Sequence, residues 1–253
     1  MRVGCLCAIL LVLSPTVGLG RGLPEASPAR WTLDIETGAV RSGYNDVRIP
    51  GDVGVKFSFS DDLETDPAPF VRLCAELRLN ERHSLDLLVA PLRLHAEGSV
   101  PREVRFHEAV FPAGAPLEGD YRFDSYRLRY RYGLMRAENL TGEVGLTAKV
   151  RDAAIRVRGG GKDSEKSNTG FVPLLNFRLL WTFSDPFGFQ LEGDALAAPQ
   201  GRAEDVMGSL LFDVNPRLTV RAGYRLLEGG ADNDEVYNFT LIHYAAVGAS
   251  IRL

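Results

Sequence analysis

The segment SYRLRYRYGL at 125–134 alternates between apolar and polar side chains at every position. Its tyrosines and leucines share one parity, and Arg127, Arg129 and Arg131 share the other. Because successive side chains of a β-strand point to opposite faces, the segment predicts a strand with one aromatic, apolar face and one face of arginines.

Nine other segments repeat this period of two, although 84–89 is less regular and His243 falls on the apolar parity of the last one. Together, ten such segments without a convincing helical pattern predict an all-β chain. The nine are 31–39, 71–78, 84–89, 144–151, 175–183, 187–195, 206–213, 218–226 and 239–253.

Short and long connections alternate between these segments. Short turns follow Leu79, Arg136, Phe183 and Phe212, and the long polar connections are 41–66, 96–120, 152–170, 198–204 and 228–237. This rhythm is typical of transmembrane barrels. We predict a transmembrane, antiparallel, up-and-down β-barrel of about ten strands, with short periplasmic turns and long external loops. A soluble barrel or sandwich with its apolar parity inward is the alternative. Alternation within 53–59 leaves the exact strand count open.

The N-terminus has the features of a secretory signal. Arg2 precedes an apolar run at 3–13, and small or helix-breaking residues follow up to Gly20. The run is shorter than the roughly 20 residues that a membrane-spanning helix needs. We therefore expect a signal peptide at 1–20, a short N-terminal segment at 21–30 and a barrel at 31–253. Cys74 is then the single cysteine of the mature chain, so no internal disulfide is expected.

Charge and composition narrow the class further. The net charge of −4 argues against a nucleic-acid-binding protein, which usually carries a basic excess. No later segment is apolar for long enough to be a transmembrane helix.

The exported N-terminus, the alternating strands, short turns as in LFDVNPRLTVRAGYRL and the final strand VGASIRL occur together. In these features the sequence resembles the porin-like bacterial outer-membrane β-barrel proteins. The resemblance implies the outer membrane of a Gram-negative bacterium, with outer-membrane lipid, lipopolysaccharide and the barrel-assembly machinery as partners. Such proteins usually end in an aromatic residue, whereas this chain ends in Leu253. A monomer without a cofactor is expected.

The inward parity is rich in charges of both signs. Ten strands lie near the narrow end of the range, where side chains fill the barrel, and the planar fork of arginine suits carboxylates. We expect ion pairs to plug the lumen, with a narrow selective channel as the alternative. The predicted network consists of Asp34, Glu36, Arg72, Glu76, Arg78, Arg127, Arg129, Arg131, Lys149, Arg151, Arg178, Glu192, Asp194, Arg221 and Arg225.

Three connections carry candidate chemistry. In YNDVRIPGD at 44–52, the side chains of Tyr44, Asn45, Asp46 and Arg48 are candidates for loop binding, because ordered loops often carry function. A loop that simply packs over the mouth is the alternative. The glycine-rich segment RVRGGGKDSEK at 156–166 is expected to be a flexible, solvated loop, and its basic residues are candidates for contact with lipopolysaccharide phosphates.

The third connection, EGGADNDEVYNF at 228–239, is acidic. Its Asp232, Asp234 and Glu235 are weak candidates for Ca²⁺ ligands. With His107 they are also weak candidates for the acid–base residues of a lipid- or peptide-directed hydrolase. The alternative is a solvated turn between the last two strands. The sequence predicts no metal or cofactor site, and we expect surface loops to act in structural, adhesive or ligand-binding roles.

Overall fold

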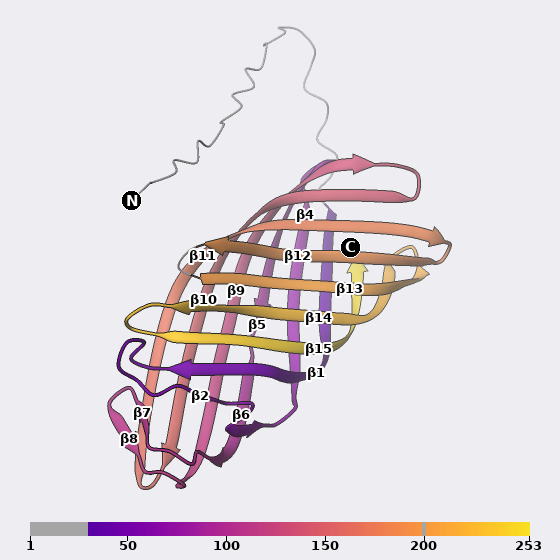
Figure 1. Ribbon diagram of the computed structural model, residues 1–253. Coiled ribbons are helices and arrows are strands. Elements are labelled where there is room, and N and C mark those ends of the chain that lie inside the picture. The colour runs from indigo at the N-terminus through magenta and orange to yellow at the C-terminus, as the bar shows by residue number, and fades with distance from the viewer. Residues whose placement is uncertain (1–29, 199–200) are drawn as a thin grey trace, which may run out of the picture.

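The computed structural model describes residues 30–198 and 201–253, so the expected signal peptide lies outside the described residues. Ten antiparallel strands form a closed barrel, and β1 pairs with β15 to close it (Figure 1). The barrel strands are β1 (Arg30–Arg48), β4 (Ala68–Arg78), β5 (His83–Ala90), β9 (Pro116–Arg136), β10 (Leu140–Gly159), β11 (Lys162–Ser184), β12 (Phe187–Ala198), β13 (Gly201–Asn215), β14 (Leu218–Asp232) and β15 (Tyr237–Arg252).

Each of the ten predicted segments lies on one of these strands, which confirms the all-β barrel. The alternation reflects two different surroundings. Leu128 and Leu146 point outward and are 48% and 62% exposed, whereas Arg127 and Arg131 point inward and are 3% and 1% exposed. The outer face is therefore apolar along the middle of the strands, and the inner face is charged.

Aromatic side chains lie on the outer face at one end of the barrel. Trp31, Trp181, Phe183 and Phe187 are each close to half exposed there, and the rings of Trp181 and Phe183 are 5.3 Å apart. This end carries the start of β1, the end of β15 and the short turns, and we call it the terminal end. The opposite end is the loop end.

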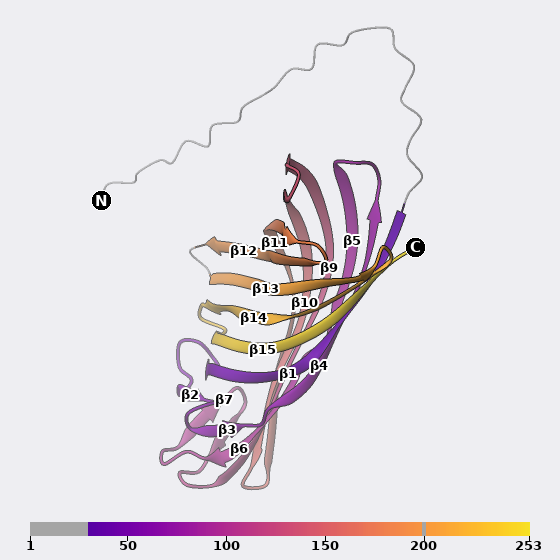
Figure 2. The same ribbon diagram turned by 90° about the vertical axis from the view of Figure 1, so that its right-hand side faces the viewer.

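Five short strands gather at the loop end (Figure 2). They are β2 (Phe57–Ser58), β3 (Leu63–Thr65), β6 (Arg93–Ser99), β7 (Val104–Phe106) and β8 (Ala109–Phe111). The strand β6 continues the pairing of β5 with β9, and β3 pairs with β6. The strand β2 pairs with β1 at two positions, so the alternating segment 53–59 adds no strand across the barrel.

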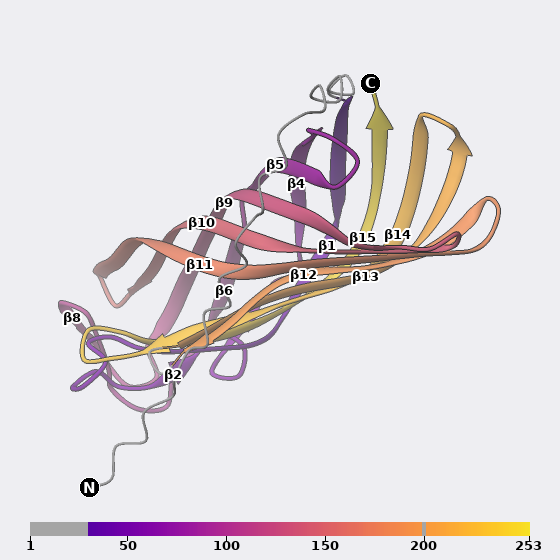
Figure 3. The same ribbon diagram turned by 90° about the horizontal axis from the view of Figure 1, so that it is seen from above.

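The long connections are of two kinds. The connections 41–66 and 96–120 contain the short strands, whereas 152–170 is almost entirely β-strand. There β10 and β11 continue outward as one hairpin (Figure 3). Its turn is Gly160–Gly161, whose φ angles of 55° and 75° favour glycine. The segment 156–166 is thus part of an extended hairpin, which differs from the solvated loop that its composition indicates.

The inside of the barrel has two layers. Buried charges lie nearer the terminal end, and a cluster of buried apolar side chains lies nearer the loop end. Among the described residues, no helix is long and apolar enough to cross a membrane.

Candidate functional site

The three arginines of β9 anchor the charged layer. Arg127 donates to Asp194 at 2.6 Å. Arg129 and Arg131 both donate to Asp86, each at 2.5 Å. All five side chains are buried. Because a buried charge needs a partner and hydrogen bonds, these pairs explain how one strand face can carry three arginines.

Two carboxylates connect distant strands. Asp205 of β13 accepts from Arg72 at 3.1 Å and from Arg225 at 2.6 Å. Glu36 of β1 accepts from Arg225 at 2.8 Å and from Arg221 at 3.0 Å. The network therefore crosses the lumen and joins strands that are not neighbours in the sheet.

Ion pairs continue toward the terminal end. Arg178 lies 2.7 Å from Glu76 and 2.6 Å from Glu143. Asp34 pairs with Arg221, and Glu192 lies 3.6 Å from Arg225. The structure thus brings most of the predicted network residues into contact.

Three predicted network residues have no ion pair within the described part of the chain, namely Arg78, Lys149 and Arg151. The Lys149 Nζ atom instead lies 4.9 Å from the centre of the Phe123 ring. Arg151 donates to the side-chain oxygen of Asn168. Arg78 is exposed at the terminal end.

The predicted network lacks four residues that the structure places in it. Asp86 and Glu143 fall on inward-facing positions of the predicted strands, whereas Asp205 and Asn176 were missed. Asp205 accepts from three arginines, and Asn176 accepts from the Nε atom of Arg131 at 2.5 Å while donating to Asp194 at 2.7 Å. Asp205 lies two residues before the inward-pointing Met207, so extending the parity of that strand by one step would have found it. Asn176 carries no charge and gave no such signal.

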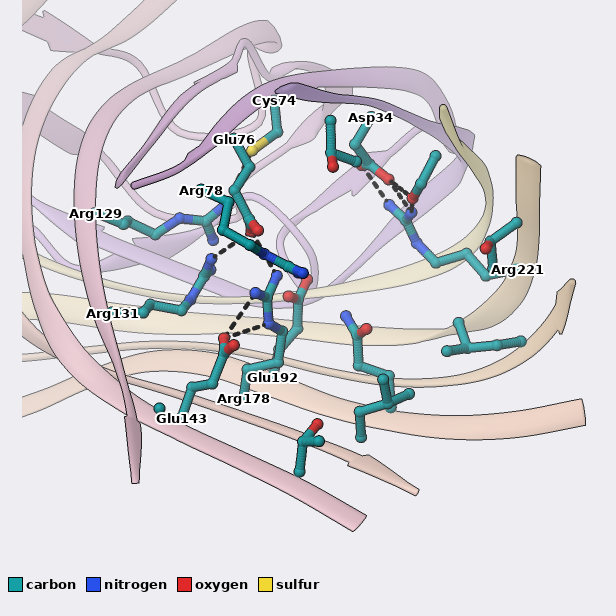
Figure 4. Close-up of a pocket in the computed structure, with 18 of the residues that line it drawn as sticks. Asp34, Cys74, Glu76, Arg78, Arg129, Arg131, Glu143, Arg178, Glu192 and Arg221 are labelled. Carbon is teal, nitrogen blue, oxygen red and sulfur yellow. Dashed lines mark hydrogen bonds and ion pairs between the residues drawn. The ribbon is translucent and has the colours of Figure 1, made fainter. Parts of the chain in front are cut away.

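A cavity of about 440 Å³ lies on the terminal side of the network (Figure 4). Its lining includes Asp34, Glu76, Arg78, Arg131 and Arg178. Figure 4 shows the side chains of Arg78, Arg131 and Arg178 pointing toward the same space beside Glu76.

Apolar side chains fill the lumen on the other side of the network. Met207 and Ile242 are 1% and 0% exposed, and the rings of Phe70 and Tyr244 meet edge to face at 4.9 Å. The short strands extend this cluster, since Phe57 of β2 packs against Phe59 and Phe106. The loop end of the lumen is therefore packed like a protein core.

Of the four candidate loop-binding residues, one points into the barrel and three point outward. A β-bulge at Ser42–Tyr44 shifts the register of β1, so odd-numbered residues, which point outward before the bulge, point inward after it. Asn45 is therefore buried inside the barrel and 1% exposed. Tyr44, Asp46 and Arg48 lie on the outer face of β1. The structure thus leaves three of the four on an accessible surface.

Around these three lies a group of aromatic and basic side chains that we call the rim cluster: Tyr44, Arg48, Lys56, Arg202, Tyr237 and Phe239. The Arg48 guanidinium and the Lys56 ammonium lie 5.0 Å and 5.1 Å from the Tyr237 ring centre. The Arg202 guanidinium lies 5.3 Å from that of Phe239. Lys56 also lies 2.8 Å from Asp46. Cation–π geometry of this kind orders basic side chains at a surface.

The candidate acidic residues and His107 lie in separate segments. Asp232, Asp234 and Glu235 are exposed at the β14–β15 turn, where Asp232 lies 3.8 Å from Arg48. His107 lies in the β7–β8 turn, and its backbone N–H donates to the Ile49 carbonyl. No hydrogen bond or ion pair joins it to the three carboxylates within the described ranges. Nor does the structure group three or more possible metal ligands anywhere in them.

His95 of β6 is the histidine that does contact carboxylates. Its Nδ1 atom lies 2.8 Å from Asp120, and its Nε2 atom lies 3.2 Å from Glu97. The hydrogen bond with Asp120, followed by that with Glu97, raises the pKa of His95 above its usual value. Both ring nitrogens are thus occupied, which favours a charged imidazolium and leaves neither nitrogen free to take a proton from a substrate.

Comparisons with known proteins identify the fold. Neither protein-family models nor curated proteins match the sequence. The solved structure of the outer membrane protease OmpT from Escherichia coli aligns with a TM-score of 0.58 at 9% identity, over 92% of this chain and 99% of that one. Ail, the attachment invasion locus protein of Yersinia pestis, aligns with a TM-score of 0.39 at 12% identity, over 88% of this chain and 99% of that one. The likeness to OmpT confirms the resemblance to bacterial outer-membrane β-barrels at the level of the fold.

Proposed function

We propose that this protein is an integral barrel of the bacterial outer membrane with a closed lumen, acting through its external surface as a ligand-binding protein. The terminal end faces the periplasm and the loop end faces outward, as short turns and longer connections do in such barrels. The apolar outer face supports insertion, because hydrocarbon accepts such a surface and a closed sheet leaves no unpaired edge.

The apolar core at the loop end carries the proposal of a closed lumen. Phe57, Phe106 and Phe111 are each at most 1% exposed, and Tyr121 and Tyr244 lie beneath them at 2% and 3%. Water and ions pass through polar, open lumens, and a packed apolar layer several side chains deep excludes both. Function then rests on the surface around that layer.

Planar-bilayer recording tests the closed lumen. We expect the folded protein to give no unit conductance steps, in bilayers where a general porin prepared in the same detergent does. Reproducible single-channel steps from the folded protein would favour the narrow selective channel instead.

The rim cluster supports lipopolysaccharide as the ligand. The apolar outer face ends near Leu226, which is exposed on β14, and the rim cluster lies just beyond it. Phosphate groups of lipopolysaccharide lie at this boundary between the apolar face and water. Arginine binds phosphate through charge-assisted hydrogen bonds. Arg41, exposed on β1 below the cluster, has no ion pair among the described residues. Arg41 and Arg48 are therefore the side chains that we expect to contact phosphate.

The test compares the unfolding temperature of the barrel with and without lipopolysaccharide. Unfolding is measured as the loss of heat-modifiable migration on gels. A ligand that binds the folded state raises the unfolding temperature. We expect lipopolysaccharide to raise it, and the double variant Arg41→Gln, Arg48→Gln to lose most of that rise. Arg217→Gln, exposed in the β13–β14 turn at the other end, is the matched control. An equal rise in all three proteins, or with phosphatidylglycerol alone, would refute this ligand.

A further inference from the structure

The cavity on the terminal side of the charged layer is a second feature, separate from the rim cluster. Its lining extends from Arg78 and Arg136, which are exposed, to Arg131 and Glu36, which are buried. Beyond that buried end come the rest of the network and the apolar core. The cavity is therefore a vestibule that a ligand enters from the terminal end.

Arginines outnumber carboxylates in this vestibule. Nine arginines line it, against five carboxylates. Four further carboxylates behind the wall, Asp86, Asp194, Asp205 and Asp213, lie near some of these arginines. Because Asp194 and Asp205 are also shared with Arg127 outside the lining, the positive charges are still in excess. Arg78 and Arg136 have no ion pair within the described residues. Positive charge without a counter-ion thus gathers at the mouth.

Arg131 gives an independent indication at the inner end. Its side chain is 1% exposed. The Nε atom donates to Asn176, and the Nη1 atom donates to Asp86 and lies 3.3 Å from Glu76. The Nη2 atom is buried and has no hydrogen-bond partner. Buried donors are almost always satisfied in folded proteins. Because Arg131 also lines the cavity, its unpaired Nη2 atom is a donor that a ligand at the inner end could satisfy after a small shift of the side chain.

From these observations we propose that the vestibule binds a small anion that carries phosphate groups. Arg78, Arg131 and Arg178 approach one space from β4, β9 and β11 (Figure 4). A tetrahedral phosphate accepts hydrogen bonds from several directions, whereas a carboxylate accepts them mainly in its own plane. The arginine fork matches phosphate oxygens. A volume of about 440 Å³ suits a small molecule. In the proposed function the terminal end faces the periplasm, so the ligand comes from the periplasm; this part of the proposal alone rests on the proposed function.

Calorimetric titration of the folded full chain with inorganic pyrophosphate tests this site. The protein is held in a neutral detergent free of lipopolysaccharide, at low salt. We expect saturable binding to one site, which weakens as sodium chloride is added. The double variant Arg78→Gln, Arg136→Gln changes exposed positions and should still fold. It should bind at least about tenfold more weakly, the loss expected for one charge-assisted contact.

Three further variants test whether pyrophosphate binding depends on the vestibule itself. Arg217→Gln removes an exposed arginine at the same end but outside the lining, and it should bind like the natural chain. The rim double variant Arg41→Gln, Arg48→Gln should also bind normally, which separates this site from lipopolysaccharide phosphates. Arg131→Gln should lose binding while its gel migration remains heat-modifiable.

Absence of saturable pyrophosphate binding to the natural chain would overturn the proposal. Equal weakening in the vestibule variant and Arg217→Gln would overturn it too, because binding would then follow net charge alone. Bilayer recording and gel migration on the same preparation report the closed barrel independently. Failure of the vestibule site is thereby distinguished from failure of the proposed function.

Discussion

Asp205 is the residue on which the charged layer converges. It accepts hydrogen bonds from Arg72, Arg127 and Arg225, at 3.1, 2.6 and 2.6 Å, and these arginines belong to β4, β9 and β14. A buried carboxylate with several charged donors is costly to remove, because its partners stay buried without compensation.

The substitution Asp205→Asn therefore has a large predicted effect. It keeps the shape of the side chain and removes the charge, leaving three buried arginines with one fewer anion. We expect the free energy of unfolding to fall by about 3–5 kcal/mol, the usual cost of breaking a buried pair. Urea unfolding of the barrel in lipid vesicles measures it. Asp185→Asn, in the exposed β11–β12 turn, is the control, and similar values for both variants would contradict the prediction.

We expect the stability of the loop end to depend on pH through His95. Its pKa is raised in the folded state by Asp120 and then by Glu97. The stability that it contributes is therefore fully present below the unfolded pKa and is lost as the pH rises through the folded pKa. We expect amide hydrogen exchange in β6 and the adjoining part of β9 to become faster across that window, after correction for intrinsic exchange.

The variant His95→Gln supplies the comparison for this pH effect. It cannot titrate, so the corrected exchange of the same amides should not change with pH. A natural chain whose profile matches that of the variant would show that the histidine contributes nothing there. About two-fifths of the side chain is solvent-exposed, 38%, so screening keeps the effect small.

At the scale of elements, the β7–β8 hairpin is held by its apolar side chains. Phe106 is 0% exposed and meets the Phe57 ring of β2 edge to face, at 6.1 Å. Replacing it with alanine removes that contact and leaves a cavity. We expect Phe106→Ala to destabilise the packed hairpin by about 3–5 kcal/mol while the barrel stays closed. Limited proteolysis of the intact barrel should then cut within 100–115 faster.

The control for the hairpin is Val53→Ala, because Val53 lies in the neighbouring connection and is 58% exposed. Its cleavage rate should equal that of the natural chain. Unchanged cleavage in Phe106→Ala would mean that the hairpin is held by other contacts.

The sequence predicted the strands well where they cross the apolar outer face and less well beyond it. Within 152–170, the inward positions Ile155 and Val157 are buried, but β11 reads SEKSNTG at 164–170. There water replaces the apolar surroundings, so no face needs to be apolar and the period of two disappears. Cross-strand pairs such as Arg156 with Asp163 replace that signal, and pairing of this kind is not evident from one strand alone.

For the whole molecule, the proposed placement in a membrane predicts how arginine is tolerated on the outside. Leu146 and Val53 are similarly exposed, 62% and 58%, but Leu146 lies on the apolar outer face and Val53 on the loop end. We expect Leu146→Arg to destabilise the inserted barrel by about 2–4 kcal/mol, and Val53→Arg to have almost no effect. Reversible unfolding from vesicles compares them, and equal effects would contradict insertion.

The whole fold was predictable because lipid-type and lumen-type surroundings impose one rule on every strand. The site was less so. Arg131 and Asp86 could be assigned to the interior by parity, but their pairing depends on how far each strand is shifted against the next. Likewise, the apolar core joins β2 and β7, which are separated along the chain, and no local pattern relates Phe57 to Phe106.

The pairing of β1 with β15 has a consequence for biogenesis. Leu33 pairs with Ile251, so the contact that closes the sheet joins opposite ends of the described chain. Until β15 is in place, β1 and β14 each present a row of unsatisfied backbone N–H and C=O groups, and open edges of this kind recruit strands from other molecules. Productive folding therefore competes with aggregation throughout assembly. The unpaired edge of β1 therefore has to be protected from strands of other molecules until β15 pairs with it.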